Sequence, residues 1–198
     1  CWMDAGELRP PEWVGCEDAP YAGGAVLELG YRAVIAAPPE TVWPALAGIG
    51  GRRGWYAGQW LWAARGWLDR LLGGVGLARG RRDPRQLWVG DALDFWRVLA
   101  VDPPRRLLLW AEMKAPGQAV LDLRLAPAGE GACELRLVAR FLPRGLAGLL
   151  YWRAALPLHR HIFPALLKAL AQGLDRPLTA PPQAFDPAAE RACRLPAG

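Results

Sequence analysis

The sequence predicts an α+β fold, in which a curved antiparallel sheet packs against a long C-terminal helix. Three observations support this prediction. Residues 90–141 contain four stretches with alternating apolar and polar side chains, separated by turn-forming segments. Residues 25–36 alternate in the same way, and residues 146–174 form a long apolar stretch with helical periodicity. An apolar sheet face needs a cover, and the terminal helix can supply it.

The register of the sheet follows from its turns. Proline- and glycine-rich turns lie at residues 102–105, 115–117 and 127–131. Antiparallel pairing places Val98 near Leu109, Leu109 near Leu123 and Leu123 near Leu137. Side chains alternate between the faces of a strand, so one face collects only apolar groups. This face comprises Trp96, Val98, Ala100, Leu107, Leu109, Ala111, Met113, Ala119, Leu121, Leu123, Leu125, Leu135, Leu137, Ala139 and Phe141.

The opposite face is mostly charged. It collects Arg97, Glu112, Lys114, Gln118, Asp122, Arg124, Glu134, Arg136 and Arg140, with Phe95, Leu108 and Trp110 among them. Arg97, Glu112 and Lys114 resemble a catalytic cluster in the sequence. Their shared face favours a surface ion pair and a cation–π contact of Arg97 with Trp110 instead. The apolar side chains beside them could dock a partner domain.

Helices are expected on either side of this sheet in the sequence. A short helix begins at Pro38 and ends at 48–51, and a second helix spans 55–72, where apolar side chains recur at helical spacing. Segment 75–89 is expected to hold a short strand and a loop. The helix at 146–174 is expected to be bent or broken near Pro157 and Pro164.

This order of elements defines a helix-grip domain over residues 25–174. Residues 1–24 are interpreted as a lead-in without periodicity. Residues 175–198 are rich in proline and alanine and are interpreted as a loosely attached tail.

Composition excludes several function classes. The chain contains no serine, which excludes a Ser-His-Asp hydrolase. Its four cysteines are scattered, which is typical of free thiols in a cytoplasmic protein and not of a zinc site. No uncharged apolar run is long enough to span a membrane. We therefore expect no metal and no membrane span.

A basic, glycine-rich loop has features of binding sites for two kinds of ligand, a dinucleotide and a nucleic acid, but we expect neither. Gly74, Gly76 and Gly80 resemble part of a dinucleotide fingerprint, but they follow a predicted helix and not a strand, so no cofactor is predicted. The basic patch comprises Arg52, Arg53, Arg79, Arg81, Arg82 and Arg85. Asp83 interrupts it and no aromatic platform accompanies it, so nucleic acid is not expected. A solvated loop, or a contact with an acidic ligand tail or partner domain, is favoured.

Four long motifs resemble a known family. They are GGRRGWYAGQWLWAARGWLDRLLGGVGLARGRRDP, VGDALDFWRV, AEMKAPGQAVLDL and FLPRGLAGLLYWRAALPLHRHIF. Together they resemble a bacterial family of unknown function in the START/polyketide-cyclase-like (SRPBCC) superfamily, over about residues 25–173. Members often form the C-terminal half of short-chain dehydrogenase- or epimerase-like proteins, although this chain has no Rossmann half. The resemblance implies a cavity for apolar or amphipathic small molecules and no established catalytic residues.

The candidate site lies between the apolar face and the terminal helix. Its ligand-binding candidates are Tyr31, Trp55, Tyr56, Trp60, Asp94, Trp96, Met113, Trp152, His159 and Phe163. Asp94, His159 and Tyr31 are the candidate catalytic groups, because a carboxylate and an imidazole in a dry cavity could exchange protons with a ligand. His159 could equally be a structural core histidine, and His161 is expected to face solvent.

Three functions remain open on this evidence. The first is ligand binding without chemistry, and the second is a cavity enzyme of cyclase, hydratase or isomerase type. The third is an accessory domain that docks onto a Rossmann-type reductase. Convergent polar groups in the cavity would favour the second function, and an open apolar slot would favour the first.

Overall fold

The computed structural model describes residues 26–50, 54–55, 67, 71, 83 and 86–190. The strands are β1 (Leu27–Ile35), β2 (Ala92–Leu93), β3 (Trp96–Asp102), β4 (Arg106–Ala111), β5 (Gly117–Pro127), β6 (Cys133–Pro143) and β7 (Gln183–Phe185). The helices are α1 (Pro39–Ala47), α3 (Gly145–Gln172) and α4 (Pro187–Glu190). The predicted second helix and the basic glycine-rich loop fall almost entirely outside the described residues.

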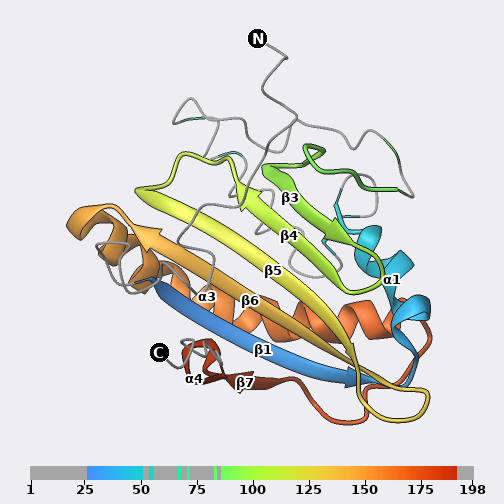
Figure 1. Ribbon diagram of the computed structural model, residues 1–198. Coiled ribbons are helices and arrows are strands. Elements are labelled where there is room, and N and C mark those ends of the chain that lie inside the picture. The colour runs from blue at the N-terminus through green and yellow to red at the C-terminus, as the bar shows by residue number, and fades with distance from the viewer. Residues whose placement is uncertain are drawn as a thin grey trace, which may run out of the picture.

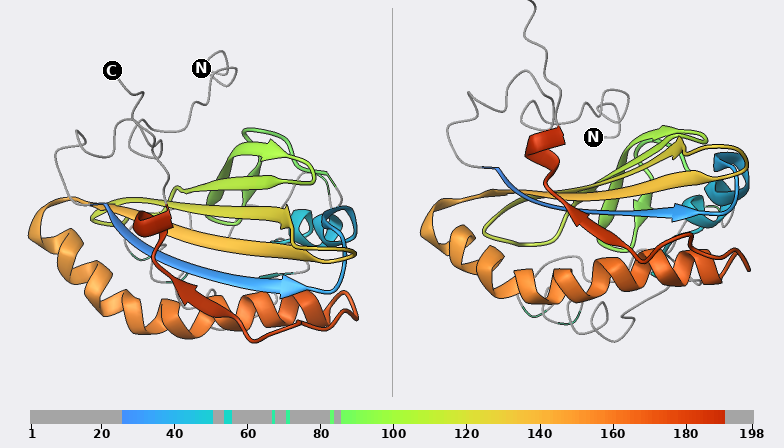
Figure 2. Two further views of the ribbon diagram at one scale, coloured as in Figure 1. Left: turned by 60° about the horizontal axis from the view of Figure 1, so that its bottom comes forward. Right: turned by 90° about the horizontal axis from the view of Figure 1, so that it is seen from below.

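The described strands form one antiparallel sheet in the order β2-β3-β4-β5-β6-β1-β7. The sheet is curved, α3 runs along one of its faces, and α1 lies at one end (Figure 1). Figure 2 shows that β7 runs beside β1 at the edge of the sheet. The predicted antiparallel sheet with a long helix is therefore confirmed.

Most of the predicted register is correct. Val98 pairs with Leu109 and Leu123 pairs with Leu137, as predicted. The pairing of Leu109 with Leu123 was wrong, because Leu109 pairs with Leu121. The error of two residues leaves every side chain on its predicted face, because the side-chain period of a strand is two.

A β-bulge between Val98 and Ala100 changes the faces in β3. Beyond the bulge, Val101 pairs with Leu107 and packs against the main core, whereas Ala100 joins an outer cluster around Leu108. The prediction that Ala100 lies on the apolar face is therefore corrected. An extra residue in one strand reverses the alternation beyond it.

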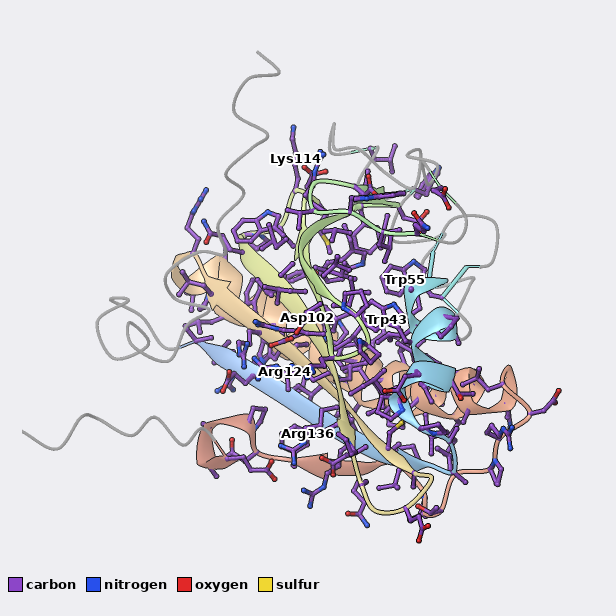
Figure 3. The ribbon with its side chains drawn as sticks, turned by 45° about the vertical axis from the view of Figure 1, so that its right-hand side comes forward. Trp43, Trp55, Asp102, Lys114, Arg124 and Arg136 are labelled. Carbon is purple, nitrogen blue, oxygen red and sulfur yellow. The ribbon has the colours of Figure 1, made fainter. Side chains whose placement is uncertain are left out.

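The main core lies between the sheet and α3. Leu123 and Leu137 are fully buried in it, whereas Arg124 is exposed and Arg136 is half-buried. Both arginines lie on the face away from α3 (Figure 3). Phe95 was assigned to the charged face, but it is buried in the main core. It lies in the turn before β3, where strand alternation does not apply.

The outer face carries a buried ion network around Asp122. Arg106 donates two hydrogen bonds to its carboxylate, at 2.9 and 3.0 Å, and Arg124 donates two more. Arg140 joins Asp122 at 3.5 Å and Glu28 at 2.7 Å. Burial alone would raise the pKa of Asp122, but the hydrogen bonds and charges of Arg106 and Arg124 outweigh it and hold the pKa below its ordinary value.

Arg97 and Glu112 form the predicted ion pair. Arg97 lies opposite Trp110 and forms an ion pair with Glu112 at 2.8 Å. It also donates a hydrogen bond to the carbonyl of Gly90. These contacts join β3 and β4 to the turn before β2.

Helix α3 is continuous through both prolines. Pro157 and Pro164 lie inside a single helix of 28 residues, so the expected break does not occur. Figure 2 shows the helix curving along its length. Proline cannot donate a backbone hydrogen bond, and its ring crowds the preceding turn. Bending of the helix relieves this crowding without breaking the helix.

Residues 177–190 are not the loosely attached tail that their composition predicted. β7 pairs with β1, and the carbonyl of Pro177 accepts a hydrogen bond from the amide of Ala36. Glu190 in α4 forms ion pairs with Arg32 and Arg136. The backbone and ionic contacts of this segment therefore join it to the sheet.

Candidate functional site

A cavity of about 90 Å³ lies between the apolar face of the sheet and the middle of α3. Its walls are mainly aromatic and aliphatic. The sheet side includes Phe95, Trp96, Met113 and Phe141, and the helix side includes Tyr151, Trp152, Leu158, His159, Ile162 and Phe163.

Stacked rings form the helix wall. His159 stacks on Phe163 with centroids 5.0 Å apart and an interplanar angle of 5°. Trp152 stacks on Phe141 at 5.6 Å and 7°. His159 and Phe163 are four residues apart on one helix, so their side chains meet on the same face. Trp152 lies two turns earlier on that face, and its ring centroid is 5.7 Å from that of His159. Three α3 rings thus form a nearly continuous surface.

The indole of Trp96 supplies the most informative polar atom. Trp96 is only 6% exposed, and within the described part of the chain its buried Nε1 has no hydrogen-bond acceptor. A buried donor without an acceptor costs free energy, and native structures seldom leave one unsatisfied. Trp96 itself lines the cavity, so this donor belongs to a residue of its wall.

Asp94 and Trp55 form their own pair beside the cavity. Trp55 donates a hydrogen bond from Nε1 to Oδ2 of Asp94 at 2.8 Å, and its ring lies 6.0 Å from that of Trp96. Neither residue lines the cavity. Asp94 adopts a φ of 55° in the turn between β2 and β3, which takes its side chain out of the strand alternation. The prediction that Asp94 begins the apolar-facing series is therefore corrected. Trp55 appears beside α1 in Figure 3.

Tyr31 also lies outside the lining. Its hydroxyl donates a hydrogen bond to the carbonyl of Arg160 at 3.5 Å. Its ring packs edge-on against Phe163 at 6.4 Å, so it supports the wall from behind. The expected convergence of Tyr31, Asp94 and His159 on one cavity does not occur. Among the three, only His159 lines it.

The remaining candidates divide into two groups. Trp96, Met113, Trp152, His159 and Phe163 all line the cavity. Tyr56 and Trp60 lie outside the described residues. His161 is exposed, as expected from its position two residues after His159.

Sequence reasoning missed Tyr151 and Leu158 as lining residues. They are seven residues apart on α3, and Ile162 continues their stripe one turn later. That spacing could have identified them beside the Trp152 stripe. Leu158 is 40% exposed and Tyr151 is half-buried, so this side of the lining is open to solvent.

A second cavity of about 270 Å³ lies between α1 and β3. It is lined by Trp43, Ala47, Gln86, Leu87, Trp88, Val101 and Pro103. None of the candidate residues reaches it, and no orphaned donor marks its walls in the part of the chain that the structure covers. Although it is larger, the cavity under α3 is the better candidate, since it combines stacked rings with a buried donor that lacks an acceptor.

Searches for two other kinds of site found no candidate. Among the described residues, no group of three or more His, Cys, Asp or Glu side chains could hold a metal ion. Within the same ranges, no helix has the length and apolar character needed to cross a bilayer.

Comparison with solved structures found several proteins of low similarity. Norcoclaurine synthase from Thalictrum flavum has 10% identity and a TM-score of 0.47, covering 81% of this chain and 91% of that one. An HSP90 activator from Plasmodium falciparum has 15% identity and a TM-score of 0.43, covering 78% and 99%. A protein from Nitrosomonas europaea has 16% identity and a TM-score of 0.45, covering 75% and 94%.

Comparison with curated proteins found no match. Residues 21–166 match the family described as "Protein of unknown function (DUF2867)". This range includes every described strand from β1 to β6 and most of α3. The chain therefore belongs to the DUF2867 family.

Proposed function

We propose that this protein is a small-molecule-binding domain of the helix-grip type, whose ligand enters the cavity between the sheet and α3. The observation that carries this proposal is the buried Nε1 of the lining residue Trp96, which has no acceptor among the described residues, in a wall that is mainly aromatic and aliphatic and whose other polar side chains include Arg140 and His159. Ligand sites commonly combine mostly apolar walls with a few directed polar groups. The ligand is therefore apolar or amphipathic and carries a hydrogen-bond acceptor, such as a carbonyl oxygen.

The size of the cavity limits how much of the ligand it encloses. Sites for drug-sized ligands usually occupy about 300–1,000 Å³. A cavity of about 90 Å³ is much smaller. It can hold a single small ring or the end of a chain, while the rest of a larger ligand lies outside. The exposed lining residue Leu158 marks the side on which that remainder would lie.

Two simple probes test the proposal. Toluene and acetophenone both present one aromatic ring, but only acetophenone carries an acceptor. We expect the protein to bind acetophenone more tightly, as measured by ligand-observed NMR. The Trp96→Phe variant removes the indole donor, so it should lower the preference for acetophenone by about five- to tenfold, the effect of one hydrogen bond.

A matched variant separates the effect of losing the indole donor from the effect of losing aromatic ring area. Trp152→Phe removes an indole from the opposite wall. It should lower the affinity for both probes by the same factor, because the Trp96 donor remains. The proposal is wrong if neither probe binds, or if filling the cavity with Ala119→Leu leaves their affinity unchanged. Native mass spectrometry of the purified protein would identify a ligand carried from the cell.

An enzyme of cyclase, hydratase or isomerase type is the second candidate, favoured by the imidazole of His159 in the wall. However, no described lining residue carries a carboxylate, and Asp94 is hydrogen-bonded to Trp55 outside the cavity. The acid–base pair that this hypothesis needs is therefore incomplete. The Rossmann-type partner domain, the cytoplasmic location and the domain boundaries stay predictions.

A further inference from the structure

The first half of α3 exposes leucine side chains to solvent. Leu146 is 71% exposed and Leu150 is 61% exposed, while Leu149 lies beside them at 41%. None of the three lines either cavity. On the same turns, the inward face of the helix buries Gly148 and Trp152. The helix is therefore apolar on both sides at this end.

The outward face continues as a stripe along the helix. Leu146, Leu150, Arg153 and Pro157 are spaced by four, three and four residues, so they share one side of the helix. All four are exposed. Leucines thus occupy the first turns of the stripe, and a basic side chain follows directly.

The charged side chains of α3 are all basic. The sequence has no aspartate or glutamate between residues 135 and 174. Arg144, Arg153 and Arg160 are exposed along the helix. The amide of Arg144 also donates a hydrogen bond to the Pro116 carbonyl, which holds the start of the helix near that turn.

Three described acidic side chains on or next to the neighbouring strands pair with arginines outside this face of α3. Glu112 is held by Arg97 at 2.8 Å. Glu28 and Asp122 lie in the network of Arg140 on the outer face. Arg144 and Arg153 therefore flank the exposed leucines, and the segment 135–174 that includes the helix contains no carboxylate side chain.

We propose that this surface, Leu146, Leu149 and Leu150 with Arg144 and Arg153, lies on an anionic lipid bilayer. Helices bind the membrane interface when large apolar side chains enter the boundary between headgroups and acyl chains while adjacent basic side chains meet anionic headgroups. The leucines project from a helix surface, so they can enter a fluid boundary without a matching groove.

A second copy of the chain fits this surface less well than an anionic bilayer does. A two-fold interface places the same patch on both subunits, which would bring the arginines of the two copies together. The bilayer instead supplies the opposite charge. This inference does not depend on the ligand of the cavity, so either proposal can fail without the other.

Vesicle co-sedimentation tests the inference. Vesicles of phosphatidylcholine with phosphatidylglycerol should retain the protein, and vesicles of phosphatidylcholine alone should retain much less. Added salt should weaken the binding, since it screens the basic side chains. Arg153→Glu should lower the partition coefficient by at least about fivefold, the value of one basic residue near an anionic surface. Leu150→Glu should lower it by about tenfold or more, because a leucine no longer enters the interface.

Ala180→Glu is the matched control. Ala180 is exposed near Leu178, which bridges to Ile35 at the opposite end of β1 from the start of α3. This variant adds the same charge away from the proposed surface and should bind as the wild type does. Circular dichroism should show that all variants are folded.

Three results would overturn the inference. The first is equal binding to neutral and anionic vesicles, and the second is an equal loss in Leu150→Glu and Ala180→Glu. The third is a dimer in the absence of vesicles that Leu150→Glu dissociates, as measured by light scattering. That result would assign the surface to contacts between copies of the chain.

Discussion

The carboxylate of Asp122 allows a stability prediction whose magnitude can be worked out. Asp122 is 1% exposed and accepts hydrogen bonds from three arginines. Removal of one partner from a buried ion pair typically costs about 3–5 kcal/mol. The side chains of Arg106 and Arg124 are 31% and 53% exposed, so they can turn to water, and Arg140 keeps Glu28. We therefore expect Asp122→Asn to lower the free energy of unfolding by about 3 kcal/mol, at the low end of that range.

Urea denaturation followed by circular dichroism measures this loss. With a slope of about 2 kcal/mol/M, the midpoint should fall by about 1.5 M. Asp102→Asn is the control, because Asp102 is exposed at the end of β3 and should cost little. A loss below about 1 kcal/mol for Asp122→Asn would show that the network contributes little net stability, as happens for many ion pairs.

The pH dependence gives an independent check on the same network. The pKa of Asp122 is lower in the folded chain than its ordinary value, despite burial, because Arg106 and Arg124 stabilise the carboxylate. Its contribution is therefore fully present above the unfolded pKa of about 4 and is lost as the pH falls through the lower folded value. Asp122→Asn should reduce the loss of stability on acidification.

Two further predictions concern β5 and β6. Burial, together with the charge of Glu40, raises the pKa of the Cys133 thiol to about 11. This thiol should therefore resist alkylation at neutral pH until the protein unfolds. Its contribution to stability should be lost as the pH rises from about 9 to about 11. Leu123→Ala should cost about 2–5 kcal/mol in urea denaturation. Arg124→Ala should cost about 1 kcal/mol or less, because the Arg124 side chain is 53% exposed and Asp122 keeps its contacts with Arg106 and Arg140. Rapid labelling of the folded protein, or equal losses for the Leu123 and Arg124 variants, would contradict these assignments.

The faces of the sheet could be predicted from the sequence because alternation depends only on strand geometry. The register between β4 and β5 could not, since the connection runs from residue 112 to residue 116 and not over the predicted turn at 115–117. A shift of two residues changes the partners of Leu109 and leaves its face unchanged. The bulge after Val98 is a local insertion that periodicity alone does not locate.

The same distinction applies to the cavity. Trp152, His159 and Phe163 could be placed on one wall because a helix fixes their relative directions. Asp94 could not, because its direction depends on a positive φ in a turn. Sequence reasoning therefore identified the aromatic wall and misplaced the carboxylate, which removed the main support for an enzymatic function.

The pairing of β7 with β1 could not be predicted from composition for a related reason. A side chain at Gly30 would meet Phe185 and Pro187 within 2.9 Å, so the glycine makes room for them. Arg32 and Arg136 then lie over the ring of Phe185 at 5.9 and 5.7 Å. The contacts of Gly30 and Arg32 join residues more than 100 positions apart in the sequence, and a proline-rich composition does not reveal them.

The packing of Gly148 allows a last prediction in which two effects oppose each other. Glycine inside a helix is less favourable than alanine by about 1 kcal/mol, so propensity alone predicts that Gly148→Ala stabilises the protein. However, an added Cβ would clash with the Pro116 carbonyl oxygen and lie 2.8 Å from Cα of Pro143. Both obstacles include backbone atoms, and overpacking of this kind typically costs about 1–3 kcal/mol.

The clash should outweigh the gain in propensity, so we expect Gly148→Ala to lower stability by about 1 kcal/mol in urea denaturation. The neighbouring variant Ala147→Gly measures propensity alone, because Ala147 is exposed. Gly148 also holds the first turns of α3 against the Pro116 turn, and Trp152 follows one turn later. The variant should therefore weaken acetophenone binding as well, whereas Ala147→Gly should not. A stabilised Gly148→Ala variant with unchanged binding would show that the start of α3 can move away from the sheet without disturbing the cavity.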